Sequence, residues 1–556
     1  MEERSTDLVR GRWVPETPAW WQRGVIYQIY PWSFADASGD GIGDLDGIRD
    51  HADYLAWLGV DAIWLSPIYP SPGVDLGYDI SDYRGIHPDL GTLDDFRRLL
   101  DAAHACGLRV LIDLVLNHTS DQHPWFRGAR EGPKNPFHDY YVWSQAPSRY
   151  AGVRGIFENE PSNWTLDDAT GLYYWHRFYS HQPDLNYENP RVQEEMLDVA
   201  RFWLDLGVDG FRVDAAPYLY EREGTSCESL PETHAFLKRL RRLVDGYEPA
   251  RILLAEANQP AEELIRYFGD GDEFQMAFHF PLMPRLFLAI RKELAAPLIG
   301  VLERTSTIPE GCQWVMFLRN HDELTLEMIP EDDRTFMWEH YASEPHLRVH
   351  SGIRRRLWPL LLGGRRQVEL LHGLILSLPG CAVIYYGDEI EMGDDVSLGD
   401  RMGVRTPMQW TTGKNAGFSS ADPSKLYAPV VTEPEYHFAG HNVQSRDRKP
   451  TSFLNWLRRI IKVHRADPVL RGGSMRVLPV ANPRVLVFAR ENEAGTILCL
   501  NNLSRFVQPA LVPVGEWIGR TPVEIIGGER FPEITRGEYL FTMGPHSLLW
   551  LRLERV

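Results

Sequence analysis

The sequence has little cysteine and no cysteine pair of the kind that binds metals. Its 556 residues include five cysteines. They lie far apart, and no Cys-x-x-Cys occurs. A small, odd and dispersed set argues against both a disulfide framework and a structural zinc site.

Positive charge is also in short supply. The formal net charge is −19 at pH 7. A surface of this sign repels phosphate groups, so we expect neither a nucleic-acid partner nor a membrane partner.

Long hydrophobic segments are absent too. Met1–Thr17 is polar and lacks the apolar core of a secretory signal. The most apolar stretch, Leu370–Tyr386, is divided by Pro379-Gly380. This pattern predicts a buried helix followed by a buried strand rather than a membrane span. We therefore expect a cytoplasmic protein.

What the chain does contain is a series of short apolar runs typical of buried parallel strands. Segments with helical spacing, such as Leu93–Cys106 and Pro190–Leu206, lie between many of them. Strands that alternate with helices predict an α/β fold with a parallel sheet, and eight strands suit a closed (β/α)₈ TIM barrel. The runs are Val25–Tyr30, Ala62–Leu65, Val110–Leu114, Gly210–Val213, Ile252–Ala255, Met276–Phe280, Trp314–Leu318 and Ala382–Tyr386.

Uneven spacing between these runs predicts the domain organisation. The barrel is expected in two parts, residues 1–116 and 185–467, with an inserted B subdomain at 117–184 after the third strand. A charged, helical insertion is expected at about 323–366, between strands seven and eight. From 468 to 556 the pattern favours a separate antiparallel β domain.

Carboxylates follow several predicted strands. Asp214, Glu256 and Asp322 come at the ends of strands four, five and seven. Catalytic groups of such barrels lie at this face, and cleavage of a glycosidic bond requires paired carboxyl groups. Arg212 lies on the same side of its strand as Asp214, so its charge should keep Asp214 ionised. Each residue alone is more often structural, but together they indicate a catalytic site.

Four segments around these residues, Asp113–His118, Gly210–Asp214, Leu254–Glu256 and Arg319–Asp322, resemble the motifs of the α-amylase family of glycoside hydrolases. The resemblance extends from Trp20 to the end of the chain. It implies a (β/α)₈ barrel, a B subdomain and a C-terminal antiparallel β-sandwich. It also implies that Asp214 is the nucleophile, Glu256 the general acid/base and Asp322 the third catalytic carboxylate.

The same resemblance implies a pocket for one terminal glucose. Asp75 and Tyr78 match the pattern of exo-acting members, and Arg405 matches the arginine that closes the pocket with Asp75. The implied sugar-binding residues are Asp75, Tyr78, His118, Gln182, Arg212, His321 and Arg405.

Two reactions on small disaccharides remain open. Tyr218–Glu228, Glu256–Gln259 and Asn320–Met328 resemble the family's trehalose synthases, which isomerise maltose to trehalose through a glucosyl-enzyme. Gln28–Phe34 and Pro67–Asp75 look more like α-glucosidases. We expect isomerisation with some hydrolysis to glucose. The alternative is an exo-acting α-glucosidase, or a sucrose-type hydrolase or transglucosidase, that acts on short α-glucosides.

A polar gate over the pocket is a further expectation. The candidates are Arg154, Asn258 and Glu323, each of which could equally be a solvated loop residue.

Two structural calcium sites are expected, and no organic cofactor. The loop Asp36–Asp44 places oxygen donors at alternate positions, as Ca²⁺ prefers, although an Asp/Gly-rich turn has the same pattern. Its ligands would be Asp36, Ser38, Asp40, Ile42 and Asp44. By resemblance a second site would use Asn117, Asp184, Tyr218, Leu219 and Glu221. A homo-oligomer is possible.

Overall fold

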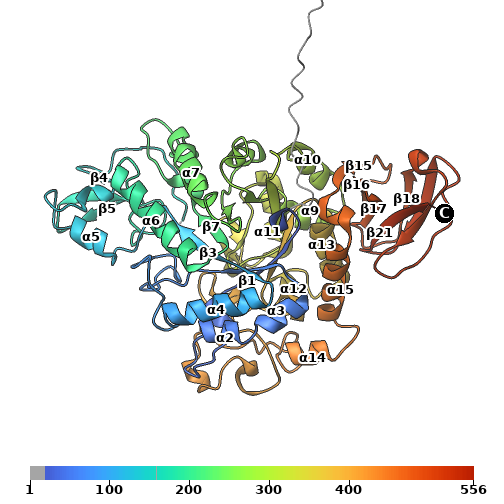
Figure 1. Cartoon of the computed structure of the whole chain (residues 1–556), viewed down its shortest axis with the longest axis horizontal. Helices are drawn as coiled ribbons and strands as arrows, with labels where there is room; N and C mark the ends of the chain where they lie inside the picture. The colour runs from blue at the N-terminus through green and yellow to red at the C-terminus, as the bar shows by residue number, and fades with distance from the viewer. Residues whose placement is uncertain (1–18, 158–159, 556) are drawn as a thin grey trace, which may run out of the picture.

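A closed barrel of eight parallel strands forms the centre of the computed structural model, which describes residues 19–157 and 160–555 (Figure 1). The strands follow one another around the barrel in chain order, and the last pairs with the first. The predicted runs are confirmed, with ends that differ by at most two residues. Met1–Thr17, expected to lack a signal, lies outside the described residues. The barrel strands are β1 (Val25–Ile29), β2 (Ala62–Leu65), β3 (Arg109–Val115), β7 (Gly210–Asp214), β8 (Ile252–Ala255), β9 (Met276–Phe278), β10 (Gln313–Phe317) and β14 (Cys381–Tyr385).

Local sequence signals define the helices around the barrel. α4 (Leu93–Ala105) begins with a capping box in which the side chains of Thr92 and Asp95 each accept a backbone N–H of the other. α6 (Pro190–Leu206) ends at Gly207, whose φ of 111° suits glycine. Both helices bury one apolar face against the strands.

The apolar stretch before the last barrel strand is confirmed as a buried helix, α13 (Arg365–Ser377), followed by β14. No helix in the described part of the chain is long and apolar enough to cross a membrane.

The insertion after β3 folds as a small unit at one end of the molecule (Figure 1). It contains α5 (Pro124–Ala129) and an antiparallel sheet of β4 (Trp143–Ser144), β6 (Leu172–Trp175) and β5 (Trp164–Asp167). A separate apolar cluster supports it, made of Val142, Tyr150, Trp164, Trp175 and Cys227.

The insertion after β10 is only partly helical. Besides α11 (Glu331–Tyr341) and α12 (Leu357–Leu360) it contains a three-stranded sheet that the sequence did not predict. Its strands have two residues each, too few to show the alternation typical of a strand. Gly352 is required there, because a Cβ would lie 2.5 Å from Glu323 Cγ. The strands are β11 (Leu324–Thr325), β12 (Arg348–Val349) and β13 (Gly352–Ile353).

The chain ends in two antiparallel sheets that enclose a second core (Figure 1). α15 (Phe453–Ala466) and α16 (Pro468–Gly472) precede them, so the first strand starts at Ser474. One sheet has the order β15 (Ser474–Val477), β16 (Val485–Asn492), β17 (Gly495–Asn502), β21 (Leu548–Arg555) and β19 (Arg520–Glu524). The other pairs β18 (Gln508–Pro513) with β20 (Glu538–Met543).

Candidate active site

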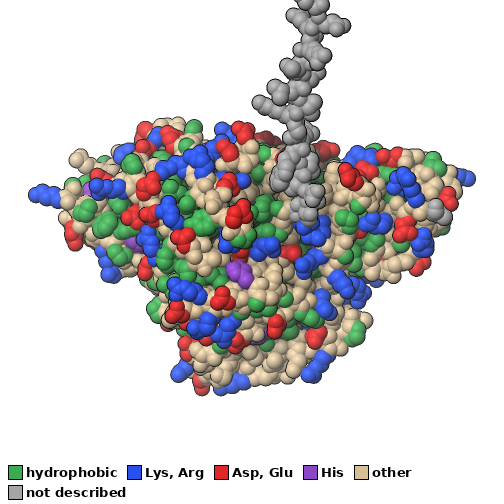
Figure 2. All heavy atoms as spheres, in the orientation of Figure 1, with side chains coloured by type: hydrophobic (Ala, Val, Ile, Leu, Met, Phe, Trp, Pro, Cys, Tyr) green, Lys and Arg blue, Asp and Glu red, His purple; other side chains and the backbone are tan. Residues whose placement is uncertain are grey.

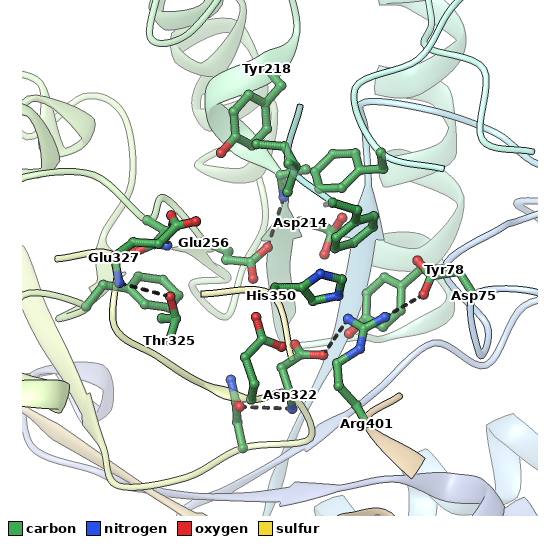
Figure 3. A pocket seen from close by; sticks show the side chains of 18 of the residues that line it. Asp75, Tyr78, Asp214, Tyr218, Glu256, Asp322, Thr325, Glu327, His350 and Arg401 are labelled. Carbon is green, nitrogen blue, oxygen red and sulfur yellow. Dashed lines mark hydrogen bonds and ion pairs between the residues drawn. The ribbon is translucent and has the colours of Figure 1, made fainter. Parts of the chain in front are cut away.

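A cavity of about 140 Å³ lies where the barrel strands end, roofed by residues of both insertions (Figure 3). Its lining brings together residues that lie far apart in the sequence. They include Asp75, Tyr78, His118, Arg212, Asp214, Glu256 and Asp322, together with Phe157, Glu323, Glu327 and His350.

Arg212 organises the centre of this cavity. Arg212 and Asp214 lie two residues apart on β7, so their side chains point to the same side of the strand, into the cavity. Arg212 Nη1 contacts Asp214 Oδ1. Its Nη2 lies 2.6 Å from Glu256 Oε1, and Nη1 lies 3.4 Å from Asp113 Oδ1. One guanidinium therefore holds the carboxyl groups of Asp214 and Glu256 close together, as a retaining glycosidase requires.

Asp214 and Glu256 differ in pKa, and therefore in protonation state at neutral pH. Burial raises the pKa of Asp214 to about 6, although the Arg212 charge opposes the rise. Burial also raises the pKa of Glu256 to about 8, with Arg212 opposing and the Asp214 charge adding to the rise. The expected effect of Arg212 is confirmed in direction, but burial outweighs it. At neutral pH Asp214 is mainly ionised and Glu256 mainly protonated, as a nucleophile and a general acid should be.

Asp322 is held by two arginines, and this corrects one expected pairing. The sequence paired Asp75 with Arg405, but Asp75 Oδ1 lies 2.8 Å from Arg401 Nη2. Arg401 Nη1 and Arg405 Nη2 lie 2.9 and 3.0 Å from Asp322 Oδ1. Arg405 therefore contacts Asp322 rather than Asp75, and its Nε also donates to the His321 carbonyl at 2.7 Å.

Sequence reasoning missed Arg401, although its position offered a signal. Arg401 and Arg405 flank the 3₁₀ turn Met402–Val404, and their spacing of four residues lets both reach the pocket from one side. Burial disfavours ionisation of Asp322, but the neighbouring His321 and the charges of Arg401 and Arg405 outweigh it and keep the pKa of Asp322 below its usual range. Burial lowers the pKa of His321 itself, so its imidazole is neutral near pH 7.

The other expected sugar-binding residues join the same hydrogen-bond network. Tyr78 Oη lies 2.8 Å from Asp113 Oδ2 and 2.6 Å from His321 Nε2. Gln182 Nε2 donates to Asp75 Oδ2 at 2.9 Å and lies 3.1 Å from His118 Nε2. His321, Gln182 and Arg405 stand behind the lining residues and contact them.

Two of the three gate candidates meet at a residue that we did not predict. Arg154 Nη1 lies 3.3 Å from Glu327 Oε1, and Asn258 Nδ2 donates to Glu327 Oε2 at 2.8 Å. Glu327 lies within Asn320–Met328, one of the segments that resemble trehalose synthases. Glu323 lines the pocket nearer Asp322, where burial raises the pKa of Glu323 to about 7. Arg154, Asn258 and Glu327, called the polar cover below, link the B insertion to the loops after β8 and β10.

An aromatic stack completes the roof. Phe157 of the B insertion stacks on His350 of the second insertion, with ring centres 4.4 Å apart. The Arg401 guanidinium lies 5.7 Å from the centre of the Phe157 ring. Arg401 thus connects the roof to Asp75 and Asp322.

The two expected calcium sites differ in how well their residues suit a cation. At the second, Asn117 Oδ1 and Asp184 Oδ2 are buried and accept no hydrogen bond from the described residues, and Glu221 is buried nearby. Uncompensated oxygens of this kind fit a hard cation.

In the loop Asp36–Asp44 the carboxylates are occupied locally. Asp36 accepts from the backbone of Gly39 and Gly41, and Asp44 caps α2 (Leu45–Arg49) by accepting from Gly47. These contacts do not favour a cation there. Among the described residues no group of three or more His, Cys, Asp or Glu is placed to hold a metal.

Comparison with known families agrees with this geometry. The profile "Alpha amylase, catalytic domain" matches residues 28–344 and 355–473. The chain belongs to the α-amylase family. A second profile, "Maltogenic Amylase, C-terminal domain", matches residues 475–550, the region of the two terminal sheets.

Within the α-amylase family the similarity to trehalose synthases is greater than that to α-glucosidases. The chain is 52% identical over 548 residues to the trehalose synthase/amylase TreS of Mycobacterium tuberculosis, covering 97% of this chain and 91% of the relative. It is 34% identical to a salivary α-glucosidase of Anopheles gambiae, covering 89% and 85%. The solved structure of the α-glucosyl transfer enzyme XgtA superposes with a TM-score of 0.78 at 31% identity, covering 97% of this chain and all of the other.

Proposed function

We propose that this enzyme isomerises maltose to trehalose by a retaining double displacement, with some hydrolysis to glucose. The similarity to trehalose synthases over nearly the whole chain supports the overall reaction. The assignment of roles rests on the pocket around Arg212.

In the first step Asp214 attacks the anomeric carbon of the non-reducing glucose while Glu256 protonates the departing oxygen. The glucosidic C–O bond breaks, a β-glucosyl ester of Asp214 forms, and glucose is released into the pocket. In the second step Glu256, now a carboxylate, takes the proton from the 1-hydroxyl of that glucose. This oxygen then displaces Asp214, and the two inversions restore the α configuration at C1 of the transferred glucose. Because the acceptor reacts through the 1-hydroxyl of its α anomer, the product has an α,α-1,1 bond.

The residues around Asp322 are proposed to bind the transferred glucose. Asp75, His118 and Asp322 line the cavity with acceptors for hydroxyl groups, and Tyr78 offers an aromatic face. Arg401 and Arg405 fix these carboxylates, so the pocket is organised before the sugar arrives.

The roof over the pocket is the observation that supports isomerisation over hydrolysis. The released glucose must remain beside the glucosyl-enzyme while it turns, and water must be kept away from Asp214. The polar cover and the stack of Phe157 on His350 lie over the pocket and restrict access to it. Hydrolysis to glucose is the reaction that follows when the roof opens.

We also propose one structural Ca²⁺ at Asn117, Asp184 and Glu221, completed by the carbonyls of Tyr218 and Leu219. The buried acceptors of Asn117 and Asp184 support it. The ion would connect the B insertion to the barrel without taking part in the displacement. The site at Asp36–Asp44, the cytoplasmic location and a homo-oligomeric state remain predictions from the sequence.

A product analysis tests the reaction. Purified enzyme is incubated with maltose, and trehalose, glucose and maltose are separated over time. We expect mostly trehalose from the wild type, and a loss of orders of magnitude in turnover from Asp214→Asn and from Glu256→Gln. Glucose as the main product would instead identify an α-glucosidase, and near-wild-type turnover in either variant would refute the assigned roles.

A further inference from the structure

Helix α15 carries a row of exposed cations on a chain whose net charge is −19. Arg458, Lys462 and Arg465 follow one another at intervals of four and three residues, so they share one helix face. The row extends over about 10 Å of the helix. Blue side chains gather in Figure 2 over the position that α15 occupies in Figure 1.

These cations line a groove between α15 and α3 (Ala52–Leu58). The groove has a volume of about 770 Å³, and Arg459 and Trp57 also line it. The Arg458 guanidinium lies 4.2 Å from the centre of the Trp57 ring, and its Nε donates to the Trp57 carbonyl at 2.9 Å. Arg458 is therefore fixed against the wall of the groove.

Positive charge in the groove is only partly balanced by neighbouring carboxylates. Within the described residues, Arg458, Arg459 and Lys462 have no carboxylate oxygen within 4.0 Å. Arg465 does have a partner, Asp61, at 3.2 Å. Asp447 is the one acidic residue among those that line the groove in the described part of the chain.

The excess continues beneath the groove, at the amino-terminal ends of the barrel strands. Asp61 is already engaged by Arg465 and by the backbone N–H of Val25 at 2.9 Å. Burial and then the charge of Arg471 lower the pKa of Arg23. Nε of Arg23 and Nε of Arg471 are buried with no hydrogen-bond partner in residues 19–157 and 160–555. This end of the barrel therefore carries more cations than its carboxylates neutralise.

We propose that the groove formed by Trp57, Arg458, Arg459, Lys462 and Arg465 binds a small ligand that carries two or more phosphate groups. Guanidinium and ammonium groups donate charge-assisted hydrogen bonds to phosphate oxygens. A single phosphate reaches only part of a row about 10 Å long, whereas linked phosphates span several cations. The site lies at the end of the barrel opposite the catalytic pocket and does not depend on the proposed reaction.

Calorimetric titration of the full chain with tripolyphosphate tests the site. We expect binding that weakens as salt is added, because salt screens exposed charges. The double variant Arg458→Gln/Lys462→Gln should raise the Kd at least tenfold. Arg97→Gln/Arg201→Gln is the matched control: it removes the same charge from exposed arginines of α4 and α6 and should leave the Kd unchanged.

Several outcomes would overturn the proposal. They are the absence of tripolyphosphate binding to the wild type, an equal loss of affinity in both double variants, or equal affinity for inorganic phosphate and tripolyphosphate. Binding of a polyglutamate peptide without binding of tripolyphosphate would also reject the ligand class. Maltose turnover by both variants should match the wild type, which shows that they fold. If no protein turns over maltose, the proposed reaction fails while the binding result still stands.

Discussion

The substitution Glu327→Gln is expected to divert the enzyme from trehalose towards glucose. Glu327 joins Arg154 of the B insertion to Asn258 of the barrel, at 3.3 and 2.8 Å. A hydrogen bond to a charged group contributes about 1.5–3 kcal/mol, against about 0.5–1.5 for a neutral one. A partly exposed ion pair contributes about 0.2–1 kcal/mol.

Glutamine keeps the size of the side chain and loses its charge, so the cover should weaken by about 1–2 kcal/mol. This corresponds to a factor of about 5–30 in the ratio of open to closed pocket. If hydrolysis takes place from the open state, glucose formed per trehalose rises by up to that factor. The assay is chromatographic separation of both products during the initial phase of maltose consumption.

Glu263→Gln serves as the matched control. Glu263 pairs with Arg266 at 2.9 Å on the surface and does not line the pocket. Its product ratio should equal that of the wild type. An unchanged glucose-to-trehalose ratio in Glu327→Gln, with turnover retained, would refute the role given to the polar cover.

Three further predictions follow from the site. The pH dependence of kcat/KM should be bell-shaped with apparent pKa values of about 6 and 8, because Asp214 must be ionised and Glu256 protonated; a flat profile from pH 5 to 9 would contradict this pairing. Arg401→Gln removes charged hydrogen bonds to Asp75 and Asp322 and should lower kcat/KM for maltose at least about tenfold, and an unchanged value would show that Arg401 is dispensable. Chelation by EDTA should lower the melting temperature of the wild type but not that of Asp184→Asn; equal responses would place the ion elsewhere or exclude it.

The barrel could be predicted because strands that are buried on both faces consist mainly of apolar residues, which can be recognised in the sequence. Each residue of β1, β2, β7 and β8 is buried. Each strand therefore appears as a mainly apolar run, interrupted by Gln28 in β1 and by the site residues Arg212 and Asp214 in β7. The sheet of β11, β12 and β13 has no such apolar run in the sequence. It forms because loops are brought together by the barrel, and strands of two residues have no period of their own.

The three carboxylates of the site could be predicted, but Arg401, Glu327 and the pairing of the arginines with the carboxylates could not. Asp214, Glu256 and Asp322 were identified because they end strands whose order places them at one face. Which arginine faces Asp75 depends on side-chain directions at the turn Met402–Val404, and Arg401 was missed for that reason. The raised pKa of Glu256 was equally out of reach, since burial, its main cause, depends on both insertions closing over the pocket.

The central claim is that the glucose released in the first step is held and used in the second. Isotopic labelling tests it directly: maltose is converted in the presence of an equal concentration of ¹³C-glucose, and the trehalose is analysed by mass spectrometry. We predict trehalose that is mainly unlabelled, because the roof retains the glucose released in the pocket. Label in most of the trehalose formed early in the reaction would show that this glucose exchanges freely with solvent, and would contradict the account.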